Sequence, residues 1–329
     1  MPTAVVTSQN PQHATRAFMS RDARIERAFR GLTFASAVAV LVLLSGIIVT
    51  LIHGSWPALR TFKLQFLISE VWNPVTEQFG ALAPLYGTAI TSAIAMLIAI
   101  PLAFGIAVFL TETCPRWLRG PISTGIELLA AVPSIVYGIW GLFVLVPLLQ
   151  QYVQPWLIDA AAPIPGVNAL FSGPPFGIGV LTAGLVLAIM VLPFITAVMR
   201  EVFRMTPIAL KEAAYGVGAT QWDVVWDVVV PSARVGMVGG VMLGLGRALG
   251  ETMAVTFVIG NAHRISMSLL APGTTISAAI ANEFTEAVGD LYTSSLIALG
   301  LLLFVITFVV IAAARLLLLR MERRSGRMQ

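Results

Sequence analysis

The sequence predicts an all-α protein that crosses a membrane six times, and three observations lead to this fold class. Of the 329 residues, 57% are hydrophobic and only 11% are charged, whereas a soluble domain carries about 25% charged residues. The mean hydropathy of the chain is +0.88. The apolar residues lie in six long runs, and a spanning helix needs about 20 such residues. The apolar side chains are therefore expected to face lipid rather than a single water-excluded core.

The first predicted span covers residues 31–53 and follows a polar, arginine-rich tail at 1–30. The early part of this tail predicts disorder. The 22 positions from 31 to 52 carry no charge, which is too long for the apolar core of a signal peptide, about 7–15 residues. We therefore expect a spanning helix, with a loop at 54–84 after it.

Five further spans form a predicted core at 85–315, followed by a basic tail at 316–329. Residues 151–175 contain five prolines and predict a loop with a short surface helix. Two threonines at 274–275 suit the N-cap of another short helix in the 260–290 loop. Pro101 and Pro133 fall within spans, where simple kinks are expected. The predicted spans are 85–110, 121–150, 176–199, 232–259 and 291–315.

Six spans place both termini on one side of the membrane, and the basic residues indicate which side. Fifteen lysines and arginines lie in the loops at 111–120 and 200–228 and in the two tails, when Arg315 at the end of the last span is counted with the C-terminal tail, whereas the opposite loops hold three. Because basic residues are enriched in cytoplasmic loops, both termini are expected in the cytoplasm. This distribution explains the isoelectric point near 9.6 without nucleic-acid binding.

Several activities are not indicated by the sequence. Neither Lys63 nor Lys211 follows a glycine, so the phosphate-binding loop of many ATP-binding proteins is absent. The histidines show no metal-ligand spacing, and no hydrolase motif occurs. Cys114 is the single cysteine, so no intrachain disulfide is possible. We therefore expect no catalytic site, no metal and no cofactor in this chain.

Few ionisable residues lie well within the predicted spans, away from their ends, namely Glu127, Arg247 and Glu251. A charge at membrane depth costs about 2.5–3.5 kcal/mol on insertion scales and usually faces the bundle interior or a water-filled path. Arg247 and Glu251 are four residues apart, so one continuous helix would present both on one face. They form either a mutually neutralising pair or the lining of an anion path, and the residue types favour the path.

Glycines recur at four-residue spacing in the same predicted helix, at positions 236, 240 and 244. Small residues at this spacing let helix backbones approach closely. Tight packing is the expected role of these glycines, and it would hold the fifth span, and with it Arg247, near the axis of the bundle.

A polar segment at 201–231 separates the fourth and fifth spans. Glu212 and the alanines after it favour a short helix, and Gly218 ends it. A second short helix is expected at 219–230, before Pro231 and the next span. Its two tryptophans would suit either the lipid interface or a groove on a partner protein. The two aspartates beside them disfavour an anionic lipid surface and so favour the partner.

This segment resembles the signature of binding-protein-dependent ABC importer permeases. The signature is E-A-A, three residues, Gly, nine residues, and an apolar-x-apolar-Pro ending, with valines here where the family more often has isoleucine and leucine. The resemblance implies a type I importer permease fold and a coupling loop at 201–231 that docks into a cleft on an ATP-hydrolysing subunit. The matching residues are Glu212, Ala213, Ala214, Gly218 and Pro231.

A finer resemblance is to the C-type permease subunit of phosphate-specific importers, carried by Gly87–Ser92, Glu127–Gly138 and Gly246–Val255. It implies one subunit of an ATP-driven phosphate importer in the bacterial inner membrane. The implied partners are a second, A-type permease, two ATP-binding subunits, a periplasmic phosphate-binding protein and the lipid bilayer. Arg247 and Glu251 correspond to the family's charged residues associated with phosphate passage.

Two other interpretations stay open. A permease for another oxyanion, such as molybdate or sulfate, would share the coupling loop. A secondary transporter driven by an ion gradient would show a more extensive relay of buried carboxylates than Glu127 and Glu251 provide. An intramembrane enzyme is disfavoured by the absence of its motifs.

Overall fold

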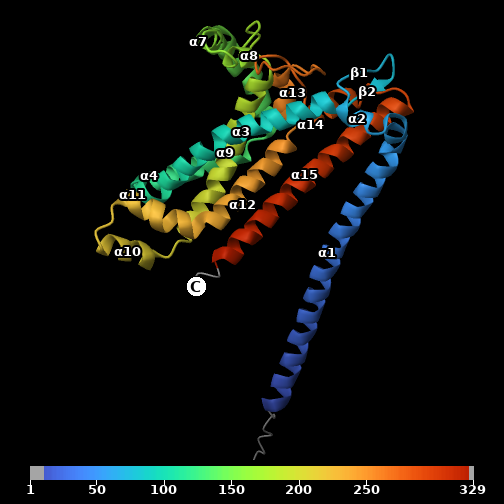
Figure 1. The fold of residues 1–329 in the computed structure, drawn as a ribbon. Helices are drawn as coiled ribbons and strands as arrows, with labels where there is room; N and C mark the ends of the chain where they lie inside the picture. The colour runs from blue at the N-terminus through green and yellow to red at the C-terminus, as the bar shows by residue number, and fades with distance from the viewer. Residues whose placement is uncertain (1–10, 326–329) are drawn as a thin grey trace, which may run out of the picture. The chain divides into compact units, whose positions relative to one another are not determined.

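The computed structural model describes residues 11–325, and these residues are mostly helical (Figure 1). The chain forms two compact units, Met1–His53 and Gly54–Gln329. Within the described residues six helical stretches are long and apolar enough to cross a membrane, which confirms the predicted number of spans. Their bounds are Ala28–Phe62, Leu82–Thr113, Ser134–Ala161, Val180–Arg204, Gln221–Leu249 and Asp290–Arg320.

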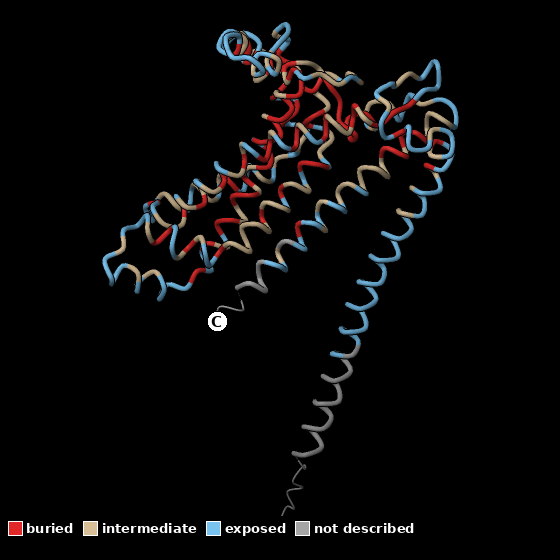
Figure 2. The backbone as a smooth tube through the Cα atoms, viewed as in Figure 1, coloured by how far each residue is buried: buried red, intermediate tan, exposed pale blue. Residues whose placement is uncertain are grey.

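Residues 11–53 of helix α1 (Pro11–Phe62) make up the described part of the first unit. Disorder was predicted for the early part of the 1–30 tail; the chain is helical from Pro11 onward, and residues 1–10 lie outside the described part. Proline suits the first helical position, and the alanine-, arginine- and glutamate-containing sequence after it has high helix propensity. Apolar side chains from Leu32 to Ile47 are exposed within this chain (Figure 2), as expected of a helix facing lipid.

The predicted loop at 54–84 contains regular structure. Its first residues continue α1, and α2 (Gln65–Ile68) follows. Strands β1 (Trp72–Asn73) and β2 (Gln78–Phe79) pair antiparallel, with Trp72 opposite Phe79. The second unit is therefore not purely helical. Strands of two residues are too short to produce an alternating pattern in the sequence.

The core of the second unit is formed by α3 (Leu82–Val108), α9 (Val180–Arg204) and α12 (Val230–Leu249), which lie side by side. Four fully buried alanines recur every four residues on α3, from Ala95 to Ala107, and let α9 approach closely. An added Cβ at glycines 236, 240 or 244 of α12 would lie 2.5–2.9 Å from side chains of α9. The predicted packing role of these glycines is confirmed.

The third predicted span, 121–150, is not one helix. Helix α4 (Arg116–Ala131) ends before Pro133, and a new helix begins as α5 (Ser134–Trp140). Val132 between them is extended, with ψ 129°, because proline disfavours the helical conformation of the residue before it. The expected kink is therefore a break, whereas Pro101 lies inside the continuous helix α3.

The new helix runs beyond the predicted boundary into the 151–175 loop. It comprises α5 and then η2 (Gly141–Leu145), α6 (Val146–Leu148), η3 (Leu149–Val153) and α7 (Gln154–Ala161), where η denotes a π-helical stretch. The short α8 (Val167–Leu170) follows in the loop.

The C-terminal part contains α13 (Met253–Ile259), α14 (Ile276–Glu283) and α15 (Asp290–Ser325). The Thr275 hydroxyl accepts a hydrogen bond from the Ala278 amide at 3.2 Å, which confirms the predicted N-cap. Helix α15 continues past the predicted boundary at 315, because leucines extend the apolar run into the basic tail. Residues 326–329 of that tail lie outside the described part.

Candidate functional site

The 201–231 segment lies at one end of the second unit, opposite the end that carries α13, α14 and the β-hairpin (Figure 1). Its helix α10 (Ile208–Gly216) carries Glu212, Ala213 and Ala214. Pro207 is the N-cap residue of this helix. None of its residues is fully buried within this chain, and all of them except the half-buried Lys211 and Ala214 are exposed. Most of the helix is therefore accessible to a partner.

A tight turn follows α10 and positions the second half of the segment. Gly218 has φ +90°, a left-handed conformation that glycine adopts without steric cost and that commonly ends helices. Thr220 then starts α11 (Gln221–Asp223) through a capping box: its hydroxyl accepts from the Asp223 amide, and the Asp223 carboxylate accepts from the Thr220 amide at 2.8 Å. Sequence reasoning missed this box, although Thr-x-x-Asp is its signature.

The second half of the segment is not a separate short helix. Helix α11 continues through η4 (Val224–Val229) into α12 without a break. Pro231 was predicted to separate two helices, but it lies inside this continuous helix, directly after the π-helical η4. The helix therefore continues past Pro231 although this residue lacks a backbone donor. The turn at Gly218 is therefore connected by one helix to the far end of α12.

Arg247 and Glu251 do not share a helix face. Helix α12 ends at Leu249, and Glu251 lies in the break before α13, where its carboxylate accepts a hydrogen bond from the Ala254 amide at 3.2 Å. The sequence at the break is rich in glycine, which weakens a helix. The predicted geometry of the pair is wrong for this reason.

Arg247 has a different neighbour. Its guanidinium carbon lies 5.9 Å from the ring centroid of Phe194 on α9, within range of a cation–π interaction. No ion pair joins Arg247 to Glu251 among the described residues. Arg247 is exposed within this chain and Glu251 is half-buried, so the arginine charge is not neutralised by the glutamate.

Glu127 lies outside the six helical stretches that are long and apolar enough to cross a membrane. It lies on α4, and its carboxylate accepts a hydrogen bond from Arg200 of α9 at 2.7 Å. The Arg200 side chain is mostly buried, so the pair fastens α4 to the core helix. The sequence analysis placed Arg200 in the loop at 200–228, but α9 extends to Arg204.

At the opposite end of the second unit, Glu283 of α14 forms contacts with β1, with α15 and with the loop that carries His263. Its carboxylate accepts hydrogen bonds from Trp72 of β1 at 2.5 Å and Tyr292 of α15 at 2.8 Å. It also lies 2.5 Å from Nε2 of His263, whose ring stacks on Trp72. Burial raises the pKa of Glu283, but its hydrogen bonds with His263, Tyr292 and Trp72 outweigh this effect and hold the pKa below its usual value. No local pattern reveals the cluster, because its members are distant in the sequence.

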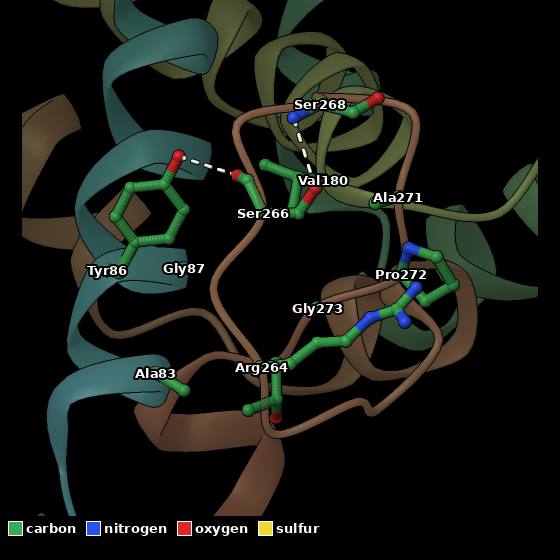
Figure 3. Close-up of a pocket in the computed structure, with 11 residues that line it drawn as sticks. Ala83, Tyr86, Gly87, Val180, Arg264, Ser266, Ser268, Ala271, Pro272 and Gly273 are labelled. Atoms are coloured by element: carbon green, nitrogen blue, oxygen red, sulfur yellow. Dashed lines mark hydrogen bonds between the residues drawn. The ribbon is translucent and has the colours of Figure 1, made fainter. Parts of the chain in front are cut away.

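A small pocket near this cluster is lined by Tyr86, Arg264, Ser266 and Ser268 (Figure 3). The Tyr86 hydroxyl donates to the carbonyl oxygen of Ser266 at 3.0 Å. The volume of the pocket is about 10 Å³, which is the space of roughly one water molecule. It is too small to hold an oxyanion, and Arg264 at its edge is exposed.

Solved structures with a similar fold are ABC transporters. A bacterial ABC transporter involved in the import of the acidic polysaccharide alginate matches with a TM-score of 0.60, over 92% of this chain and 98% of its own, at 14% identity. The MetNI methionine ABC transporter, in an inward facing conformation, matches with a TM-score of 0.53, over 76% of this chain and 99% of its own, at 16% identity. At these identities the similarity shows the fold alone, which is that of an ABC transporter permease.

Sequence comparisons are more specific. A family model described as "binding-protein-dependent transport system inner membrane component" matches residues 99–323. The phosphate transport system permease protein PstC of Mesorhizobium japonicum is 64% identical, over 93% of this chain and 96% of its own. The PstC protein of Pasteurella multocida is 56% identical, over 92% of this chain and 94% of its own. The chain therefore belongs to the binding-protein-dependent transport system inner membrane components and, within them, to the PstC-type permeases.

Proposed function

We propose that this chain is the transmembrane permease subunit of an ATP-driven phosphate importer in the bacterial inner membrane. The observation that carries the proposal is the 64% identity, over nearly the full length, to a protein named as a phosphate transport system permease. The chain would form half of the translocation path beside an A-type permease. Two ATP-binding subunits would hydrolyse ATP, and a periplasmic binding protein would deliver phosphate, so this chain needs no catalytic site.

In this assembly the 201–231 segment and both termini face the cytoplasm, as the distribution of basic residues favours. The exposed helix α10 would dock on an ATP-binding subunit through the surface around Glu212. Because α11, η4 and α12 form one continuous helix, a displacement of the docked segment would be carried directly into the core. Arg247 lies in the last turn of that helix.

Arg247 would attract the phosphate anion within the path. Its charge is available because it stands beside Phe194 rather than in an ion pair with Glu251. One arginine supplies the positive charge that an anion needs at membrane depth. Glu251, which lies nearby in the sequence, would limit how tightly the anion is held, so that the anion can also leave the path.

Reconstitution tests this function. The four-component complex is placed in proteoliposomes, and uptake of radiolabelled phosphate is measured with the binding protein outside and ATP inside. Arg247→Gln is expected to abolish uptake while the complex still assembles. Arg264→Gln is the matched control, because this arginine is exposed on a loop beside a pocket too small for phosphate, and its uptake is expected to stay normal.

Competition between anions identifies the substrate, and omission of the ATP-binding subunits tests the energy source. Unlabelled phosphate should suppress uptake, and sulfate or molybdate at the same concentration should not. Equal competition by sulfate or molybdate would instead identify a permease for another oxyanion. Uptake that persists without the ATP-binding subunits would identify a secondary transporter, and normal uptake by Arg247→Gln would refute the role of this arginine.

A further inference from the structure

Polar side chains from three helices converge where α3 ends. Helix α3 continues as the π-helical η1 (Phe109–Thr113) at the same end as the 201–231 segment. Within η1, the Glu112 carboxylate lies 2.6 Å from Nζ of Lys211 on α10. The Glu112 carbonyl oxygen accepts a hydrogen bond from the Gln221 side chain on α11 at 2.8 Å. The Arg119 guanidinium on α4 donates to the Thr111 carbonyl oxygen at 3.2 Å.

The Glu112–Lys211 pair is shielded from water, unlike an ordinary surface ion pair. The exposed fraction of the side chain is 8% for Glu112 and 18% for Lys211. By contrast, Arg204 and Glu201 in the same region are 47% and 58% exposed and 3.9 Å apart. Breaking a shielded pair leaves a poorly solvated charge and is costly, whereas an exposed pair contributes little. Lys211 is therefore a fixed attachment for Glu112.

The two donors to Glu112 stand on either side of the turn at Gly218. Lys211 belongs to the helix before the turn and Gln221 to the helix after it, so both halves of the segment are attached to one residue. A third contact joins the same regions, because the rings of Phe104 on α3 and Trp226 on η4 lie 5.6 Å apart. The segment is thus joined to α3 as well as to α12.

We propose that Glu112 is a positioning residue that transmits the movement of the 201–231 segment to α3, in parallel with the continuous helix that transmits it to α12. This inference rests on the proposed function. Through the two attachments α3 and α12 move with the segment as one body. Without the attachment at Glu112, ATP-driven movement of the segment would be transmitted to α12 alone. ATP would then be hydrolysed without the complete conformational change that transports phosphate.

The coupling ratio tests the proposal. Phosphate taken up per ATP hydrolysed is measured in proteoliposomes holding the complete complex. Glu112→Gln and Lys211→Gln are each expected to lower this ratio at least about fivefold, the lower end of typical coupling between two sites. The double variant Glu112→Lys with Lys211→Glu restores the pair with reversed charges and is expected to recover most of the ratio. Arg116→Gln removes an exposed cation from α4 and is expected to keep the wild-type ratio.

A structural role alone predicts a different result. In that case uptake and ATP hydrolysis would fall together as less complex assembles, and their ratio would stay at the wild-type value, which overturns the proposal. Loss of ATP-driven phosphate uptake by the wild-type complex would refute the proposed function instead, so the two failures are distinguishable.

A linker experiment covers the case in which the single variants do not assemble. Cysteines replace Glu112 and Lys211 in a Cys114→Ser background, and a bis-maleimide bridges them in the assembled complex. If α3 and the segment move as one body, the unbridged double variant should show the lowered coupling ratio, and the bridge should raise the ratio towards the wild-type value while uptake continues. A bridge that stops uptake while the unbridged double variant transports would show that the two regions separate during the cycle, and this result overturns the proposal.

Discussion

Replacing Gly87 by alanine is expected to destabilise the contact between α3 and the loop before α14. A Cβ at this buried position would meet the carbonyl oxygen of Thr274 well inside contact distance, and its carbonyl carbon at 2.9 Å. Because both of these atoms belong to the backbone, rotation of a side chain cannot relieve the clash. The loop is also held in place, because the Ile276 amide donates a hydrogen bond to the Thr88 hydroxyl at 2.9 Å.

Two destabilising contributions and one stabilising contribution set the change in the free energy of unfolding. Overpacking of a filled site costs about 1–3 kcal/mol, and displacement of the loop loses the Ile276–Thr88 hydrogen bond, worth about 1 kcal/mol. The higher helix propensity of alanine offsets about 1 kcal/mol. The free energy of unfolding should therefore fall by roughly 1–3 kcal/mol, which lowers the Tm by several degrees.

The single cysteine supplies the assay. Cys114 is buried, so a thiol-reactive dye reports its exposure as the detergent-purified full chain is heated. Gly105→Ala is the control on the same helix, because an added Cβ there meets nothing within 4 Å, and its Tm should be equal to or above that of the wild type. A Gly87→Ala chain as stable as the Gly105→Ala chain would refute this account of the contact.

Two further predictions concern the ends of the second unit. Glu283→Gln should lower the Tm at pH 7. The folded pKa of Glu283 lies below its ordinary value of 4.5, so the stabilisation by this carboxylate is present above pH 4.5 and is lost as the pH falls through the folded pKa. The difference in Tm between the wild type and the variant should therefore shrink in acid. A difference that stays constant between pH 7 and pH 3 would contradict this linkage. Gly218→Ala should weaken co-purification of the ATP-binding subunits, because a left-handed alanine costs about 1–2 kcal/mol. Gly216→Ala needs no left-handed conformation, and an equal effect of both substitutions would count against the importance of the turn.

Hydrophobic patterning was sufficient to predict six spans, because a helix must bring about 20 apolar residues together to cross lipid. The ends of the helices were harder to predict, as three prolines illustrate. Pro101 and Pro231 stay inside continuous helices, whereas Pro133 separates two helices. All three lack the same backbone donor. The result at each depends on packing against helices that are distant in the sequence, which no local pattern records.

The candidate functional site, like the fold, was predicted only in part from the sequence. The residue types and their spacing singled out Arg247 and Glu251, because charges are rare in apolar runs, but the shared helix face does not exist. Glu112 was missed altogether. A glutamate in a short polar loop gives no local signal, and its partner Lys211 lies 99 residues further along the chain. Its importance becomes visible only when both side chains are found shielded from water.

The break between α12 and α13 sharpens the roles proposed for Arg247 and Glu251. Arg247 belongs to the helix that continues from the 201–231 segment, whereas Glu251 is tied to the start of α13. Helix α13 packs closely on α5, where an added Cβ at Gly138 would lie 3.0 Å from Cα of Ala254. The two charges therefore stand on different sides of a helix break, and only the arginine lies on the helix that α10 and α11 would move. A path in which the attracting charge moves relative to the repelling one can hold an anion in one state and release it in the other, which a fixed ion pair on one helix face could not do.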